Sequence, residues 1–312
     1  MSELVEEAIA PAGQTPRGIE GRSPWQLAWE RLRHDKVAIA SAVTIVLIVL
    51  MAICAPLVAK IVGHGPNTQY SFGTSDSGLP VGPSSKFLFG ADELGRDVFV
   101  RVFYGARISL LAGVVASLLA VAAGVIIGLL AGYLGRIVDT VLSRFMDVVL
   151  SMPYLIFAIA LVSVVGPSLS VSIAVIAFFS FAAVGRVVRG QVLSLSQREF
   201  VEAARSLGAG PIRIMFVDIL PNVLAQVIVY ATLLVPAAIV FEATLSFFGL
   251  GVTPPTATWG GMIAEAQNYY QVAWWMLVMP SVFLLLLTLA FNLLGDSVRD
   301  AFDPRYTRTT AK

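Results

Sequence analysis

The strongest constraint in this sequence is a set of six apolar runs, each with few charges. They cover residues 37–59, 106–134, 145–165, 169–184, 223–245 and 273–294. A bilayer core about 30 Å thick takes about 20 helical residues to cross, and lipid leaves backbone groups no hydrogen-bond partner outside a helix or a closed barrel. The sequence therefore predicts an all-α, polytopic membrane protein with six transmembrane helices.

The distribution of Lys and Arg predicts the orientation of these helices. With six spans both termini lie on one side, and the segments on that side carry 16 Lys and Arg residues, against five in the segments on the other side. Cytoplasmic flanks carry the excess of basic residues in membrane proteins. We therefore expect both termini in the cytoplasm.

The spans divide the chain into five parts. These are a cytoplasmic tail with an interfacial amphipathic helix (1–36), the first transmembrane helix (37–59), an external loop (60–105), a five-helix core (106–296) and a second cytoplasmic tail (297–312). The amphipathic helix follows from Trp25, Trp29 and Leu32, which recur at helical spacing beside basic residues. Within the core, 196–221 is a cytoplasmic loop and 251–272 an external loop that we expect to form a folded cap.

The cytoplasmic loop 196–221 has the pattern of a helical hairpin. Ser196 and Glu199 have the spacing of a capping box, which predicts a helix start. Gly208 can adopt the left-handed conformation that ends a helix, and Pro211 suits the first position of a second helix, which Pro221 would close. The apolar stripes of the two helices are Phe200, Ala203, Ala204 and Leu207, then Ile212, Met215, Phe216 and Ile219.

A small-residue helix outside the bilayer gains little stability unless another surface packs against it. Ala203, Ala204 and Gly208 permit close approach but bury little area of their own. The pattern favours a docking surface for a partner. The alternative is a loop that packs only on the ends of its own helices.

The residues of this loop resemble a known family. Glu202-Ala203-Ala204, Gly208 and Ile219-Leu220-Pro221 are similar to the EAA loop of permease subunits in bacterial ATP-binding-cassette importers, in particular the C-type subunit of the dipeptide and oligopeptide permeases. The general pattern has an apolar residue where this chain has Asp218. Residues 90–97, 104–110 and 295–300 also resemble family signatures, and the resemblance covers about residues 25–305.

The resemblance implies a function, a set of partners and a location in the plasma or inner membrane of a prokaryotic cell. The chain would form half of a translocation pathway for peptides, with nickel, glutathione or haem as alternative substrates. Its partners would be a second homologous permease subunit, two ATPase subunits or one fused ATPase, an extracytoplasmic substrate-binding protein and the lipid bilayer. The residues that correspond to the ATPase-docking motif are Glu202, Ala203, Ala204, Gly208, Leu220 and Pro221.

Several other functions are disfavoured by what the sequence lacks. It contains no Gly-Lys pair, so it has no phosphate-binding loop of its own, and ATP and Mg would be used by partner subunits. Two histidines and the single Cys54 exclude a histidine-built or cysteine-built metal site, and the net charge of +1 gives no field for nucleic acid. We expect no catalytic residues, bound cofactor or metal. An ion-coupled secondary transporter remains the alternative from another class.

Some polar residues in or near the spans are candidates for the pathway or its gate. Glu242 and Asp147 are intramembrane acids, which are often functional, although each can instead hold helices together. Trp259 lies in the third external loop. Asp92, Glu93, Arg96 and Asp97 end the first external loop and are candidates for contact with the binding protein. Gly124, Gly128 and Gly132 recur every fourth residue and predict close helix packing, within this chain or with the partner permease.

Overall fold

The computed structural model describes residues 24–303, so the predictions for most of the two tails lie outside the described residues. The described part is helical, with two isolated β-bridges and no strand. Its α-helices are α1 (Pro24–Leu32), α2 (Lys36–Val62), α3 (Val98–Leu134), α4 (Arg136–Ser151), α5 (Tyr154–Val165), α6 (Leu169–Leu195), α7 (Glu199–Ser206), α8 (Pro211–Arg213), α9 (Leu220–Phe247), α10 (Trp259–Ala266) and α11 (Trp274–Phe302).

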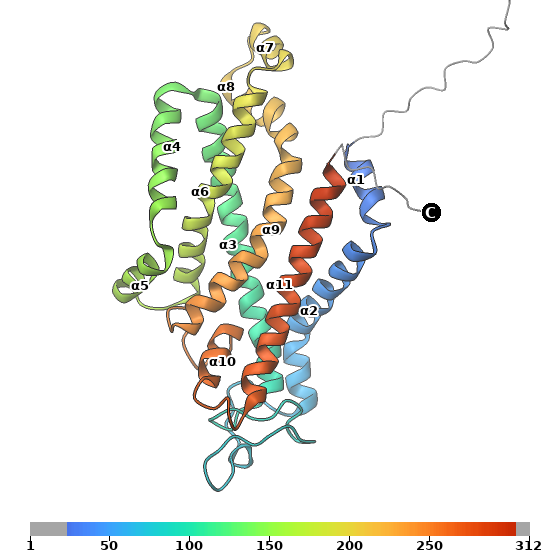
Figure 1. Cartoon of the computed structure of the whole chain (residues 1–312), viewed down its shortest axis with the longest axis vertical. Coiled ribbons are helices and arrows are strands. Elements are labelled where there is room, and N and C mark those ends of the chain that lie inside the picture. Colours follow the sequence, from blue (N-terminus) through green and yellow to red (C-terminus); the bar gives the residue numbers. More distant parts are fainter. Residues whose placement is uncertain (1–23, 304–312) are drawn as a thin grey trace, which may run out of the picture.

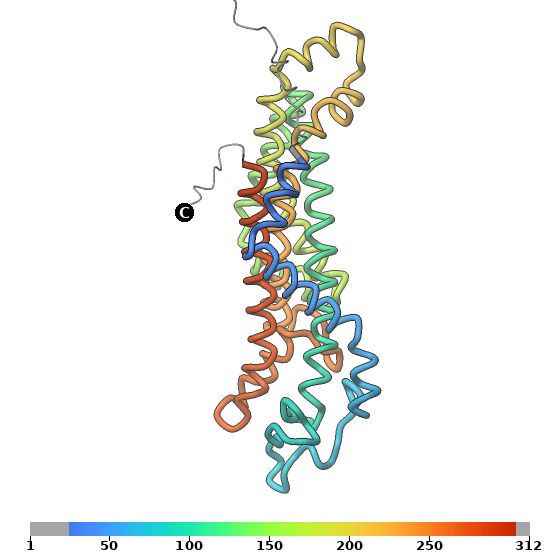
Figure 2. The backbone as a smooth tube through the Cα atoms, turned by 90° about the vertical axis from the view of Figure 1, so that its right-hand side faces the viewer, coloured from blue at the N-terminus to red at the C-terminus, as the bar shows by residue number. Residues whose placement is uncertain are grey.

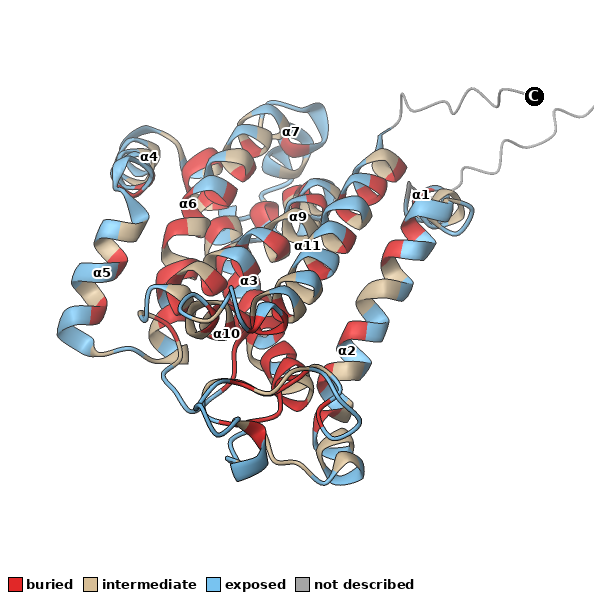
Figure 3. Ribbon diagram, turned by 60° about the horizontal axis from the view of Figure 1, so that its bottom comes forward, coloured by how far each residue is buried: buried red, intermediate tan, exposed pale blue. Residues whose placement is uncertain are grey.

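The long helices form a single bundle with distinct ends. α3, α6, α9 and α11 lie in its middle, the α4–α5 pair on one side and α2 on the other (Figure 1). Helices α7 and α8 project at one end, here called the hairpin end. The segment 63–97 and α10 cover the other, here called the loop end (Figures 1 and 2). Buried residues concentrate where the central helices face one another, and α2, α4 and α5 are largely exposed (Figure 3).

Five helices are each long and apolar enough to span a membrane, and the α4–α5 pair is a sixth candidate. The sequence predicted a continuous third span at 145–165, and this detail is wrong. The pair is bent by 87° between Ser151 and Tyr154. Pro153 explains the break, because its ring disfavours the helical conformation of the residue before it, and Met152 is extended at ψ 132°.

The second span is longer than the sequence predicted. Helix α3 begins at Val98 rather than at residue 106, because the Asp97 carboxylate accepts hydrogen bonds from the backbone amides of Phe99 at 2.8 Å and Val100 at 3.3 Å. Its 37 residues extend about 55 Å at 1.5 Å per residue. The first eight or so residues of α3 therefore belong to the loop end rather than to the bilayer.

The contact between α3 and α6 is the most extensive between any two helices of the described chain. The glycines at 124, 128 and 132 face valines of α6 with the same spacing, Val184, Val188 and Val192. A Cβ atom added to Gly128 would lie 2.7 Å from the Val188 Cβ and 2.8 Å from the Gly185 carbonyl oxygen. The three glycines therefore pack within this chain and allow the two backbones to touch.

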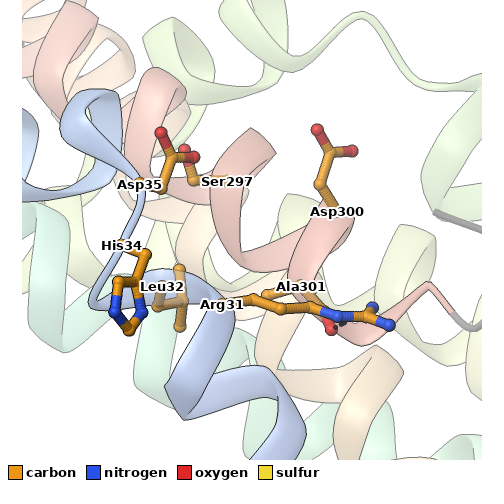
Figure 4. A pocket seen from close by; sticks show the side chains of 7 residues that line it. All are labelled: Arg31, Leu32, His34, Asp35, Ser297, Asp300 and Ala301. Atoms are coloured by element: carbon orange, nitrogen blue, oxygen red, sulfur yellow. Dashed lines mark hydrogen bonds between the residues drawn. The ribbon is translucent and has the colours of Figure 1, made fainter. Parts of the chain in front are cut away.

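Helix α1 is present as the sequence predicted, and it packs against the end of α11 (Figure 4). The Arg31 guanidinium donates hydrogen bonds to the backbone carbonyls of Ala301 at 3.1 Å and Asp303 at 2.8 Å. These carbonyls end α11 and have no partner within the helix. Trp25 also packs edge-to-face on Phe302 at 5.0 Å. The short helix thus caps the last span.

The glycine contact gives a prediction about stability. Gly128→Ala should lower the free energy of unfolding by about 1–3 kcal/mol, because backbone atoms of α6 cannot move aside as a flexible side chain could. Gly190→Ala on α6 is the matched control, since an added Cβ there meets nothing within 4 Å. Thermal unfolding of both variants in detergent measures the difference. Equal unfolding temperatures would contradict the proposed role of the contact.

Candidate functional site

The hairpin at residues 196–221 begins differently from the sequence prediction. Helix α6 continues to Leu195, and Ser196 is helical at φ −62° and ψ −16°, with its hydroxyl donating to the Leu193 carbonyl at 2.9 Å. Ser196 therefore ends α6 and does not cap α7, so the predicted capping box is wrong. Helix α7 starts at Glu199, with Arg198 at its N-cap position and no side-chain cap.

The turn of the hairpin agrees with the prediction. Gly208 has a φ of 82°, in the left-handed region. Its amide donates to the Arg205 carbonyl at 3.0 Å, and the Ala209 amide donates to the Ala204 carbonyl at 3.0 Å. This pair of bonds is a Schellman motif, which satisfies carbonyls that the end of α7 would otherwise leave free. The turn is therefore closed by hydrogen bonds rather than loose.

The second arm of the hairpin is continuous with a membrane span. It starts with Pro211 at the first position of α8, passes through a π-helical segment, Ile214–Ile219, and joins α9 without a break. The prediction that Pro221 closes this arm is wrong. Pro221 is the second residue of α9 and lies directly after the wide π turn, in which the Leu220 amide donates to the Met215 carbonyl, and the helix continues past it. Movement of the arm would therefore be transmitted to α9.

The inner face of the hairpin packs on the bundle. Val201, Ile214 and Ile219 are fully buried, in a cluster that includes Val188 and Val192 of α6. The Arg205 guanidinium lies 5.7 Å from the centre of the Tyr133 ring. Of the predicted stripe on α7, only Ala204 joins this cluster. The prediction placed the inward face wrongly, because α7 turns Val201 and Ala204, rather than the whole predicted stripe, toward the π-helical segment of the second arm.

The outer face of the hairpin is apolar and exposed. Phe200 is 41% exposed, Leu207 88% and Ile212 72%, and Ala203 lies beside them. Of the residues expected to dock an ATPase, four are exposed and two are half-buried. The exposed ones are Glu202, Ala203, Gly208 and Pro221, and the half-buried ones are Ala204 and Leu220. The first four residues of the motif share α7 and its turn, whereas Leu220 and Pro221 lie at the base, in α9.

A cluster of charged residues forms a second candidate site at the loop end. The Arg96 guanidinium contacts the Asp92 carboxylate at 2.6 Å and Glu265 at 3.0 Å, and Arg101 contacts the same Glu265 oxygen at 3.0 Å. Glu93 completes the cluster at 3.2 Å from Arg96. These contacts join the segment 63–97 to α3 and α10. The carboxyl groups of Asp92, Glu93 and Glu265 lie within 4.8 Å of one another, and the two arginines can balance the charge of only two of them.

The cluster corrects one set of predictions. Asp92, Arg96 and Asp97 were expected to contact a binding protein, but their residues are at most 2% exposed. Asp97 is engaged at the α3 N-terminus and with His64, whose Nδ1 lies 2.6 Å from its carboxylate. Buried charges need partners, so these side chains face inward, and of the four residues only the Glu93 side chain is partly exposed, at 18%.

Two members of the cluster, Arg101 and Glu265, were not identified as site residues from the sequence. They are 164 positions apart, and no local spacing connects them.

The remaining candidates lie between helices. The Trp259 indole is fully buried and donates to the Val102 carbonyl at 3.0 Å, which fixes α10 to α3. The Glu242 carboxylate is also fully buried and accepts hydrogen bonds from Ser109 of α3 at 2.9 Å and from Ser246 at 2.7 Å. Asp147 is half exposed and contacts Arg186 of α6 at 2.7 Å. Each of these three side chains therefore contacts a second helix of the same chain.

Two parts of the chain match known protein families. Residues 124–308 match the family described as binding-protein-dependent transport system inner membrane component. Residues 23–76 match the N-terminal transmembrane domain of oligopeptide transport permease C.

Named relatives match over nearly the whole length of both chains. The di/tripeptide transport system permease protein DppC of Pseudomonas aeruginosa (strain UCBPP-PA14) is 40% identical over 91% of this chain and 93% of its own. The oligopeptide transport system permease protein OppC of Escherichia coli (strain K12) is 42% identical, over 92% and 93%. The glutathione transport system permease protein GsiD of Escherichia coli O1:K1 / APEC is 40% identical, over 96% of both chains.

A solved structure shares part of the fold. It is an inward facing conformation of the MetNI methionine ABC transporter, with a TM-score of 0.52 and 20% identity. The match covers 63% of this chain and 94% of the other. At that identity the likeness concerns the fold alone.

The charge cluster predicts a pH-dependent stability. Burial, and then the negative charges of Asp92 and Glu265, raise the pKa of Glu93 from 4.5 to about 7, and its Oε2 atom is buried with no hydrogen-bond partner among the described residues. The folded protein therefore holds this proton more tightly than the unfolded chain. The resulting stability is fully present below pH 4.5 and is lost as the pH rises through about 7.

Glu93→Gln should accordingly raise the unfolding temperature at pH 8 and leave it nearly unchanged at pH 5, because the amide is neutral at both. Glu202→Gln, at an exposed position, is the matched control and should show no such pH-dependent difference. Unfolding curves at the two pH values test this. A Glu93→Gln variant less stable than the original protein at pH 8 would mean that the ionised carboxylate is stabilising.

Proposed function

Because the chain belongs to the family of binding-protein-dependent transport system inner membrane components, we propose that it is a permease subunit of an ATP-driven importer for di- or oligopeptides. The observation that carries the substrate class is the 40–42% identity to peptide permeases over more than nine tenths of both chains. The six candidate spans, counting the bent pair as one, agree with a role as a membrane component.

A second substrate is favoured by one specific observation. The relative named for glutathione transport is as similar as those named for peptides, at 40% identity over 96% of both chains. Glutathione is itself a short peptide-like molecule, so one pathway chemistry suits both. The sequence resemblance also leaves nickel and haem open, and uptake assays with the matching binding protein would discriminate among these substrates.

The proposed orientation places the hairpin end in the cytoplasm and the loop end outside. It rests on the excess of Lys and Arg in the segments of the hairpin end. One six-span chain forms half of a pathway, so the importer also contains a second homologous permease subunit and an extracytoplasmic binding protein. ATP and Mg are bound by two ATPase subunits or by one fused ATPase, and this chain is non-catalytic.

The hairpin is the proposed entry point for the energy of ATP hydrolysis. Its exposed apolar face, with Phe200, Ala203, Leu207 and Ile212, stands in the cytoplasm, where an unpartnered apolar surface is costly. Glu202 and Gly208 border that face. Its first arm follows α6 after only three residues and packs on the π-helical segment of the second arm, which continues into α9. An ATPase that moves the hairpin would therefore move both spans.

An insertion in the turn tests this transmission. Three glycines added after Gly208 should abolish ATP-driven uptake in proteoliposomes while ATP hydrolysis continues, because the docked helix could then move without α9. The same insertion after Gly166, at the opposite end of α6 in open space, is the matched control and should leave uptake largely intact. Uptake at the original rate in the Gly208 variant would refute rigid transmission.

The external surface proposed for the binding protein is tested by cross-linking. After Cys54→Ser removes the only cysteine, Glu93→Cys and Tyr270→Cys place thiols at the loop end, where Tyr270 is 54% exposed. Both should capture the binding protein with a short bifunctional reagent. Leu118→Cys, exposed in the middle of α3, should not. Absence of capture from both loop positions in every nucleotide state would count against this contact.

A further inference from the structure

Arg107 is a charged side chain that belongs neither to the hairpin nor to the charge cluster. It is exposed on α3, and no carboxylate pairs with it in the part of the chain that the structure describes. Its one described contact is the Tyr104 ring, 5.8 Å away. The next 27 residues of α3, 108–134, contain no charge. That length spans about 40 Å of helix, more than a bilayer core, so Arg107 marks the boundary of the hydrocarbon.

Two cavities meet at this arginine. The first, of about 420 Å³, lies between α2 and α3 and is lined, apart from Arg107, only by apolar side chains. They are Val49, Ala52, Ile53, Leu110, Leu111 and Val114. The second, of about 450 Å³, lies toward the loop end and includes the polar residues Asn67, Tyr104 and Thr256. Arg107 and Leu111 line both cavities.

The combination of a groove and a cation specifies an amphipathic anion. An apolar groove at the edge of the hydrocarbon is filled by hydrocarbon chains, because contact of its walls with water is unfavourable. An unpaired guanidinium at the same depth attracts an anion and binds phosphate with two parallel hydrogen bonds. The polar cavity beside it offers hydrogen-bond donors and acceptors to the polar groups that are bonded to a phosphate. One molecule with these three parts is a phospholipid.

We propose that the loop end of the α2–α3 groove is a phospholipid-binding site, with the phosphate on Arg107 and one acyl chain between α2 and α3. The site lies in the leaflet nearer the loop end and is separate from the peptide pathway. Bound lipid would fill the groove beside α2, a helix with few buried residues, and hold it against α3. The inference does not depend on which substrate the importer carries.

The test uses the full chain in nanodiscs of phosphatidylcholine with a small fraction of phosphatidylglycerol that carries a photoreactive group in its acyl chain. Mass spectrometry should find the cross-link on peptides of α2 and α3. Arg107→Gln should lower this labelling about tenfold, as expected for a lost charge-assisted hydrogen bond, and Arg107→Lys should keep most of it. Lys60→Gln, the same charge change at the loop end of α2 outside both cavities, should have no effect.

A second variant separates the groove from overall folding. Val49→Trp fills the acyl groove with Arg107 intact and should also lower the labelling, at an unchanged unfolding temperature. Unchanged labelling in Arg107→Gln, or displacement of the lipid by millimolar inorganic phosphate, would overturn the proposal. So would cross-linking of Leu111→Cys to the second permease subunit, because a partner helix would then occupy the groove.

Discussion

The direct contact between the backbones of α3 and α6 is the constraint on which the other arrangements depend. Gly124, Gly128 and Gly132 have no side chain of their own, so α3 lies directly against the valines and backbone carbonyls of α6. In lipid the hydrophobic effect gives helices no reason to associate, so close packing of this kind supplies the stability. Two further elements are held next to α6. The Asp139–Arg189 pair attaches α4 to it, with an oxygen–nitrogen distance of 2.7 Å, and α7 follows it after three residues, with Val201 buried in the same apolar cluster as the α6 valines.

Helix α3 extends the same support to the loop end. Its first turns are capped by Asp97 and carry Arg101, which shares Glu265 of α10 with Arg96. Trp259 adds a buried hydrogen bond from α10 to α3. Asp92 and Glu265 are paired with the two arginines within the chain, and leaving a buried charge unpaired would be costly. Helix α3 therefore connects the surface proposed to meet the binding protein with α6, the helix that leads into the hairpin.

The sequence was informative where a pattern is local. Runs of apolar residues predicted the spans, the spacing of the α3 glycines predicted close packing, and Gly208 predicted the end of α7. The sequence was misleading where a local pattern is compatible with two different structures. Ser196 has the form of a cap but ends α6, because α6 continues beyond its predicted limit. The proline at 153 was visible, but apolarity on both sides of it favoured one span. The Arg101–Glu265 contact joins distant positions, so no spacing could have predicted it.

The central claim is that the hairpin, the two spans joined to it, α6 and α9, and the closely packed α3 move together when ATP binds. Its direct test is the distance between spin labels at Glu199 on α7 and Ile126 on α3, in the complete importer and in a background without Cys54. Both positions are exposed. The account predicts the same distance distribution without nucleotide and with trapped ATP. A distribution that shifts or broadens on ATP binding would show that the hairpin pivots on its own and would contradict the claim.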